Sequence, residues 1–344
     1  MLVAPASRGM RLRPAGRTGP ALTSKKLLLL VLLTVVVFVG LAGYGDFKEI
    51  GRRLAHFPFT YLIAALALAA VNYGLRFLRW AYYLRVLGIR LPLGVNGLVF
   101  LSGLAMSITP GKAGELIKSY LLRDRTGVPV SASAPVVVME RITDVVSVTL
   151  LALLGLALLP LPLVAALTAV LLVSGAALVL IATRKGDRMF GLPLLRRWSD
   201  ALRASYQGLR QLAASKVMPV AVVLGVAAWF SEGLALWVIL RGLDADVALT
   251  RVLPIYAAAT LVGALSALPG GLVGTEGSMV ALLQQSGIAR GPASAATLLV
   301  RLATLWFAVA VGLVALVWLN RFGPPRVPAP SGGEQDHQAW QVRS

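Results

Sequence analysis

One short motif occurs twice in the chain, as Thr109-Pro-Gly-Lys-Ala-Gly-Glu115 and as Leu268-Pro-Gly-Gly-Leu-Val-Gly-Thr-Glu276. Each copy follows a short apolar run and precedes an arginine inside an otherwise apolar segment. That arginine, Arg141 or Arg301, lies 31 or 32 positions after the proline of its own copy. The matched offsets predict an internal repeat of about 160 residues, and such a repeat sets the architecture of the whole chain.

The composition around these motifs is that of a membrane protein. Of the 344 residues, 58% are hydrophobic, and the mean hydropathy is +0.80. Several apolar runs approach or exceed the ~20 residues that a membrane helix needs. The sequence lacks the series of alternating ten-residue strands that would predict a β-barrel. The net charge of +19 is typical of cytoplasmic loops that face anionic lipid, so we expect no nucleic-acid partner. The sequence predicts an all-α polytopic membrane protein.

The residue types that carry most enzyme chemistry are scarce. The chain contains no cysteine, and its two histidines, His56 and His337, lie far apart in a loop and in the tail. This excludes disulfides and thiol chemistry, and no His/Cys cluster predicts a zinc site. No Gly-x-x-x-x-Gly-Lys-Ser/Thr phosphate loop is present. We therefore predict no catalytic residue, no metal and no cofactor.

The apolar runs predict about six full spans and one surface helix. A basic arm, 1–26, and a polar tail, 321–344, are expected to be disordered and cytoplasmic, and the surface helix covers about 198–212. The second span is expected to leave the membrane near Arg76-Phe-Leu-Arg79-Trp80, with Trp80, Tyr82 and Tyr83 as interfacial anchors. The predicted spans are 27–43, 59–80, 134–159, 163–182, 217–240 and 292–319.

Two further apolar segments are too short to cross. The segment 95–108 has 14 residues, which gives roughly 21 Å of helix against a hydrocarbon core of ~30 Å. Each short segment ends at helix-breaking residues, so we predict two re-entrant helical hairpins, over about 95–122 and 252–288. The predicted hinge residues are Pro110, Gly111, Gly114, Pro269, Gly270, Gly271 and Gly274.

The distribution of positive charge orients this arrangement. Predicted cytoplasmic segments hold 23 of the 33 Lys and Arg residues, and predicted external loops hold six. This bias predicts cytoplasmic N- and C-termini in the plasma membrane. It also makes the two hairpins enter from opposite faces, which is an inverted-topology repeat with halves of about 59–182 and 217–320.

Nine charged residues are predicted to lie at membrane depth, where each charge costs at least ~2.5–3.5 kcal/mol. They must therefore face the protein interior and find partners. Glu140, Arg141 and Asp144 share one helical face, whereas the matching face of the second half keeps only the arginine. Two helix breaks, carboxylates and arginines together favour a site for an anionic headgroup. The predicted substrate-binding residues are Lys112, Glu115, Lys118, Glu140, Arg141, Asp144, Glu276 and Arg301.

Structural alternatives account for each element separately. The Pro-Gly motifs could be simple turns, and a Glu–Arg pair could fix packing alone. Lys112 and Lys118 could extend to the membrane interface. Glu232, a further acid in the span 217–240, is as compatible with a structural role as with a functional one. The sequence leaves open whether each glutamate pairs within its own half or across the halves.

These stretches resemble the lysylphosphatidylglycerol synthase transmembrane, or flippase-like, family. The resemblance spans about residues 25–320 and rests on Arg79-Trp80, Pro110-Gly-Lys-Ala-Gly-Glu115, Glu140-Arg141-Ile-Thr-Asp144, Leu268-Pro-Gly-Gly271 and Arg301. It implies an integral plasma-membrane protein that moves a lipid between leaflets. In long family members a soluble domain makes an aminoacylated lipid. We expect that domain to be absent here, so lysyl transfer is not implied.

Three functions follow as hypotheses. The first is a transporter of an anionic or aminoacylated lipid: a phospholipid, a polyprenyl phosphate or a glycolipid. The second is a membrane glycosyl- or acyltransferase, because Asp244 and Asp246 form an Asp-x-Asp sequence in an external loop. The third is an accessory subunit of a lipid-modifying enzyme encoded nearby. Membrane lipids are the expected partners in each case, and the oligomeric state is not predicted.

Overall fold

The computed structural model describes residues 39–40, 43–44, 47–109, 114–155, 160–183, 199–214, 216–325 and 327. Most of the first predicted span, 27–43, lies outside these residues, as do the basic arm and most of the tail. Pro110, Gly111 and Lys112 of the first motif also lie outside them.

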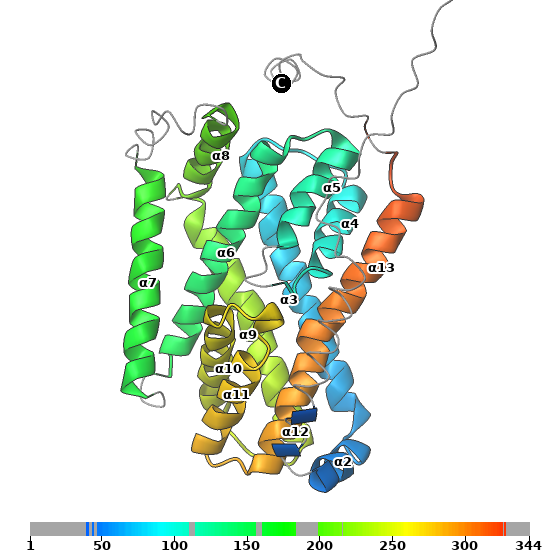
Figure 1. Ribbon diagram of the computed structural model, residues 1–344, viewed down its shortest axis with the longest axis vertical. Helices are drawn as coiled ribbons and strands as arrows, with labels where there is room; N and C mark the ends of the chain where they lie inside the picture. Colours follow the sequence, from blue (N-terminus) through cyan, green and yellow to red (C-terminus); the bar gives the residue numbers. More distant parts are fainter. Residues whose placement is uncertain are drawn as a thin grey trace, which may run out of the picture.

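Within the described residues every regular element is helical, which confirms the predicted all-α class (Figure 1). The first half contains α2 (Phe47–Ala55), α3 (Phe59–Val86), α4 (Leu93–Leu104), α5 (Ile117–Thr126), α6 (Val130–Leu153) and α7 (Leu161–Ala182). The remainder contains α8 (Ser199–Leu212), α9 (Met218–Gly242), α10 (Leu249–Leu265), η4 (Pro269–Gly271), α11 (Gly274–Gln285), α12 (Arg290–Arg301), the π-helical turn η5 (Leu302–Trp306) and α13 (Phe307–Phe322).

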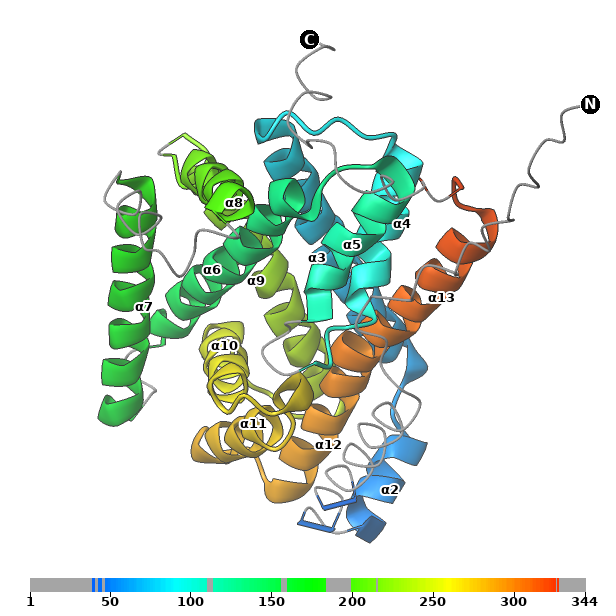
Figure 2. The same ribbon diagram turned by 45° about the horizontal axis from the view of Figure 1, so that its top comes forward.

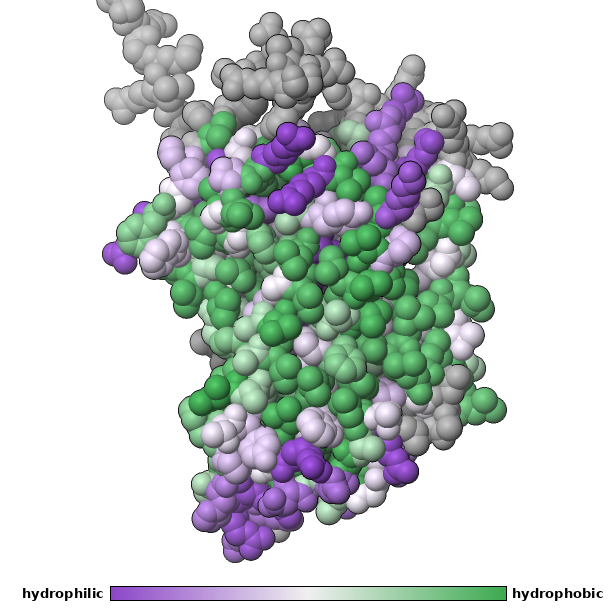
Figure 3. All heavy atoms as spheres, turned by 180° about the vertical axis from the view of Figure 1, so that it is seen from behind, coloured by the Kyte–Doolittle hydropathy of each residue, from purple (hydrophilic) through white to green (hydrophobic). Residues whose placement is uncertain are grey.

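The predicted spans correspond to long helices. Among the described residues, four segments are long and apolar enough to cross a membrane: α3, α7, α9 and the continuous segment Arg290–Phe322. The expected span over 134–159 is α6, whose 24 residues include three charged ones. Figure 3 shows a broad hydrophobic band on one face, with hydrophilic residues gathered at both ends of the molecule. The chain is a multi-pass membrane protein.

The two pairs of short helices, α4–α5 and α10–α11, lie at opposite ends of the molecule. In Figures 1 and 2, α4 and α5 lie at the end where α13 finishes, and α10 and α11 lie at the end near α2. The helix α3 packs against α9, which runs in the opposite direction. Each pair packs on the long helix of the other half: α4 contacts α13, and α10 contacts α6. The order of elements therefore repeats with inverted direction.

The end of the second span differs from the prediction. Instead of leaving the membrane near Arg79, α3 continues to Val86, and Trp80 and Tyr83 are both 0% exposed. The prediction that these two aromatic residues are interfacial anchors is wrong, because their polar atoms bond inside the protein. The Trp80 indole N–H donates to Asn96 Oδ1 at 2.8 Å, and the Tyr83 hydroxyl donates to Thr143 at 3.3 Å.

Candidate functional site

A cavity of about 330 Å³ lies where the two halves meet. Residues from α3, α6, α9, α10, η4 and the segment around η5 line it, so both halves contribute to one space. Most of the lining is apolar or carries a hydroxyl group. Its charged members are Arg76, Arg141, Asp144, Glu232 and Arg301.

Glu115 is the centre of the charged network behind the first-half wall of this cavity. It lies just after the first helix break and is 1% exposed. Its carboxylate contacts three cations: Arg141 at 3.0 Å, Lys118 at 3.3 Å and Arg76 at 3.4 Å. The backbone N–H of Gly114 donates to Thr109 Oγ1 at 2.9 Å, which bridges the break that presents Glu115.

Lys118 connects this network to α6. Its ammonium lies 2.6 Å from Glu140 Oε2, and both side chains are buried, at 1% and 0% exposure. The ammonium also lies 4.7 Å from the centre of the Trp80 ring, a cation–π geometry. Lys118 therefore does not extend to the membrane interface, so the snorkelling alternative for it is wrong.

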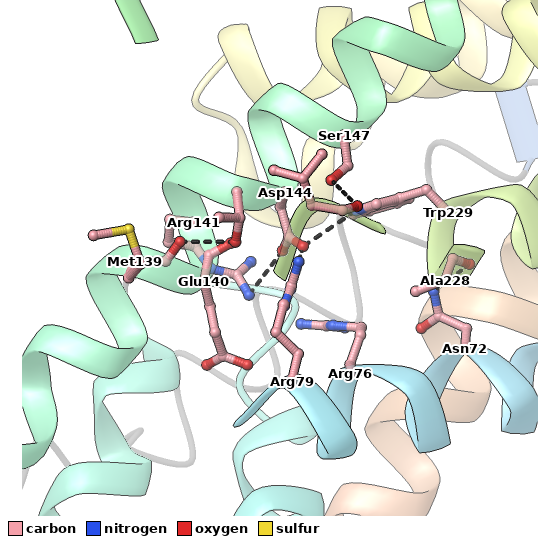
Figure 4. Close-up of polar contacts among 12 residues, drawn as sticks. Asn72, Arg76, Arg79, Met139, Glu140, Arg141, Asp144, Ser147, Ala228 and Trp229 are labelled. Atoms are coloured by element: carbon pink, nitrogen blue, oxygen red, sulfur yellow. Dashed lines mark hydrogen bonds and ion pairs between the residues drawn. The ribbon is translucent and has the colours of Figure 1, made fainter. Parts of the chain in front are cut away.

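Asp144 joins three helices. It pairs with Arg79 from α3, with Arg141 on its own helix at 3.0 Å, and accepts the indole N–H of Trp229 from α9 at 3.2 Å. Figure 4 shows Arg79 pointing from α3 toward this carboxylate, with Arg76 beside it on the same helix. Because such a carboxylate is surrounded by donors, it holds α3, α6 and α9 in register beside the cavity.

The second half carries a simpler arrangement. The Nε of Arg301 donates to Glu276 Oε1 at 2.6 Å, and its Nη2 donates to the carbonyl of Gly270, also at 2.6 Å. Gly270 and Gly271 have φ angles of 62° and 68°, which glycine adopts without strain. The helix break at η4 therefore turns a backbone carbonyl toward Arg301.

The last span is interrupted directly after Arg301. Residues Leu302–Trp306 form a π-helical turn rather than the continuous α-helix that the sequence predicts. The hydroxyl of Tyr73 on α3 donates to the carbonyl of Thr304 in this turn at 2.8 Å. Insertions of this kind are frequent at functional sites because they free a backbone carbonyl for other partners.

Glu232 lines the cavity from α9. The hydroxyl of Tyr256 on α10 donates to its Oε2 at 2.6 Å, and both residues are buried. The sequence left the role of Glu232 open. The structure places it on the wall shared with Arg301 and Arg76.

The repeat brings equivalent residues into equivalent contacts. Glu115 pairs with Arg141, and Glu276 pairs with Arg301, so pairing stays within each half. The other network residues have no charged counterpart. The positions that match Lys118, Glu140 and Asp144 at the same offsets from these pairs hold Met279, Val300 and Thr304.

Comparison with known proteins agrees with this architecture. A family model described as the lysylphosphatidylglycerol synthase TM region matches residues 27–312. The chain belongs to this family. The resemblance expected from the motifs is therefore confirmed over most of the chain.

Relatives of similar length come from Methanothermobacter thermautotrophicus. One "UPF0104 membrane protein" is 22% identical over 325 residues, covering 86% of this chain and 95% of that protein. A second is 25% identical over 308 residues, covering 83% and 90%. "Glycosyltransferase AglD" of Haloferax volcanii is 28% identical over 123 residues, which are 36% of this chain and 20% of that protein.

In this member of the lysylphosphatidylglycerol synthase TM family, the predicted site residues fall into two groups. Arg141, Asp144 and Arg301 line the cavity. Gly270 and Gly271 of the second break line it as well. The other predicted residues that the structure describes lie behind this wall or belong to the two helix breaks. Those residues are Glu115, Lys118, Glu140, Glu276, Gly114, Pro269 and Gly274.

Two arginines were misplaced by the sequence reasoning. Arg76 and Arg79 were assigned to the cytoplasmic end of a span, but they are 4% and 0% exposed and belong to the network. A usable signal was present, since the apolar run continues past them to Leu84. Tyr73, Tyr256 and Trp229 were also missed, because buried aromatic residues are common in any helical core.

Proposed function

We propose that this protein moves an anionic lipid, such as a phospholipid, a polyprenyl phosphate or a glycolipid, between membrane leaflets. The composition of the cavity wall carries the proposal. Arg76, Arg141 and Arg301 come from three helices of both halves, and the remaining wall is mostly apolar. Arginine binds phosphate through paired N–H···O contacts, so this wall suits a phosphate-bearing headgroup.

The size and the mouth of the cavity favour a lipid over a soluble anion. A volume of about 330 Å³ holds a headgroup and leaves the acyl chains outside. Leu265 and Leu268, at the tip of the second hairpin, line the cavity and are 64% and 40% exposed. Exposed leucines at the edge of the cavity provide an apolar exit for chains while the headgroup stays with the arginines.

The inverted hairpins provide a route for alternating access. Each hairpin reaches the cavity from its own end of the molecule and ends in a glycine-rich break. In inverted-repeat transporters, rocking of one repeat against the other opens a fixed central site to each side in turn. We place the Arg85 end in the cytoplasm of a plasma-membrane protein. When the buried Arg76 and Arg79 are left out of the count, the predicted cytoplasmic segments still hold 21 of the 33 Lys and Arg residues.

The proposal predicts that Arg141→Ala and Arg301→Ala each slow lipid movement strongly. The assay uses proteoliposomes that contain purified protein and fluorescent phosphatidylglycerol, phosphatidylcholine or polyprenyl phosphate, with dithionite quenching of the outer leaflet. Loss of one headgroup contact is expected to slow movement about tenfold to a hundredfold. Arg123→Ala is the matched control, because Arg123 is an exposed arginine paired only with Asp124 in the described part of the chain.

Unchanged movement in both folded cavity variants would contradict the proposal. Arg141→Lys and Arg301→Lys refine it, because lysine keeps the charge but loses the paired contact. Movement that lysine restores only partly supports direct phosphate binding, whereas full restoration indicates that charge alone matters.

A second candidate function is glycosyl transfer, favoured by the partial match to the glycosyltransferase AglD. The Asp-x-Asp sequence lies beyond α9, where Asp246 is 90% exposed and pairs with Arg241. Paired acids at such a site could hold a metal–phosphate donor. Metal-dependent sugar transfer to a polyprenyl phosphate that is lost in Asp244→Asn would establish this function in place of lipid movement.

A further inference from the structure

The two halves differ in how their charges are balanced around the cavity. In the first half, four cations (Arg76, Arg79, Lys118 and Arg141) surround three carboxylates, those of Glu115, Glu140 and Asp144. In the second half, Glu276 pairs with Arg301, and the carboxylate of Glu232 lies on the same cavity wall as that arginine. Among the described residues of this network, the first half thus carries one excess positive charge and the second half one excess negative charge.

Within the described residues, the carboxylate of Glu276 has fewer ion-pair partners than that of Glu115. Arg301 is the ion-pair partner found for it in the described part of the chain, whereas Glu115 contacts three cations. Its Oε2 is buried and accepts no hydrogen bond from the described residues. Met279, which is 0% exposed, occupies the position where the first half has Lys118.

We infer that Glu276 takes up one proton when an anionic headgroup binds Arg301; this rests on the proposed function. The ten charges of this network that belong to the described residues sum to zero, so a bound phosphodiester would leave one net negative charge among them in a buried site. An uncompensated charge in a medium of low dielectric is strongly unfavourable. Protonation of Glu276 restores neutrality and frees Arg301 for the phosphate.

The neighbouring groups direct the proton to Glu276. Glu232, on α9, already accepts the hydroxyl of Tyr256 from α10. Arg301 on α12 is the cation that the headgroup competes for. When the headgroup binds Arg301, Glu276 is the carboxylate whose ion pair is weakened. Its Oε2 accepts no hydrogen bond from the described residues, so it can receive the proton without breaking another bond.

The consequence is coupled movement. The proton enters from the aqueous side with the headgroup and leaves when the headgroup leaves, so that Glu276 pairs with Arg301 again. One proton then crosses with each anionic lipid, and a proton gradient sets the preferred direction. The arginines of the first half contact the headgroup without proton uptake, because the excess positive charge of that half already balances the negative charge of the phosphate.

Calorimetry can count this proton without measuring transport. Dioctanoyl phosphatidylglycerol is titrated into the full-length protein in detergent at one pH, in two buffers of different ionisation enthalpy. This lipid has no titratable group near neutral pH. We expect an uptake of about one proton per lipid bound, and an affinity that rises up to about tenfold for each unit that pH is lowered.

Glu276→Gln should bind this lipid with no proton uptake and little pH dependence. Asp124→Asn, which removes an exposed carboxylate, should leave the uptake unchanged. Binding by the unmodified protein without proton uptake would overturn the inference and leave the proposed function intact, so the test does not depend on how the variant folds. Uptake that persists in Glu276→Gln would also overturn it. Absence of binding would overturn the anion site itself.

Discussion

The variants Lys118→Met and Glu140→Val copy into the first half the residues that the second half has at the matching positions, Met279 and Val300. They therefore ask whether this buried pair is needed for stability. We predict that each substitution alone destabilises the protein and that the two together partly compensate. The physical reason is that a buried charge is tolerated only with its partner.

The structure sets the size of each effect. In Lys118→Met, Glu140 keeps a 0% exposed carboxylate without the ammonium that lies 2.6 Å away, a loss of ~3–5 kcal/mol. In Glu140→Val, Lys118 still has Glu115 at 3.3 Å and the Trp80 ring, so we expect only ~1–2 kcal/mol. The double variant should recover ~2–3 kcal/mol of the summed loss as coupling energy.

The assay is reversible unfolding in mixed micelles, followed through the fluorescence of the tryptophans. Replacing the exposed pair Arg123–Asp124 by Met and Val is the matched control, and we expect a change of at most ~1 kcal/mol there. Losses that add within ~0.5 kcal/mol in the buried double variant would refute the reasoning, since independent sites add and coupled charges do not.

Two other predictions concern packing and orientation. A Cβ on Gly312 would lie 2.1 Å from the backbone nitrogen of Ala105, so Gly312→Ala should separate α13 from α4 and lower stability by ~1–3 kcal/mol in thermal unfolding. Gly175→Ala, with open space around it, should cause no loss. Because the chain has no cysteine, Arg123→Cys and Asp246→Cys can be labelled singly with an impermeant maleimide in intact cells. We expect labelling at 246 only; the reverse pattern would invert the proposed orientation.

Local features explain what could be read from the sequence. The repeat, the helix breaks and most spans follow from apolar run length and from proline and glycine positions, which act through neighbouring residues alone. The helices α7 and α9 begin and end within two residues of their predicted spans. The four residues Glu115, Arg141, Glu276 and Arg301 were identified because the duplication places them at matched offsets.

Two arginines were placed wrongly because their charge was taken as the mark of the membrane surface. Arg76 and Arg79 were assigned to the membrane surface because arginines usually mark the end of a span. Their burial depends on Glu115 and Asp144, which lie 39 and 65 residues further along the chain. The apolar run that continues to Leu84 indicates burial, but no pattern around Arg76 identifies these distant partners.

The sequence by itself determined that this is a helical membrane protein with a duplicated, inverted arrangement and charges that must face inward. Only the tertiary structure decided which charges meet, that each glutamate pairs within its own half, and that one cavity joins both halves. Tyr73 and Thr304, 231 residues apart, lie on opposite sides of this junction and bond directly. Hydropathy and helix breaks act locally, whereas the stability of a buried charge depends on partners that folding brings from distant helices.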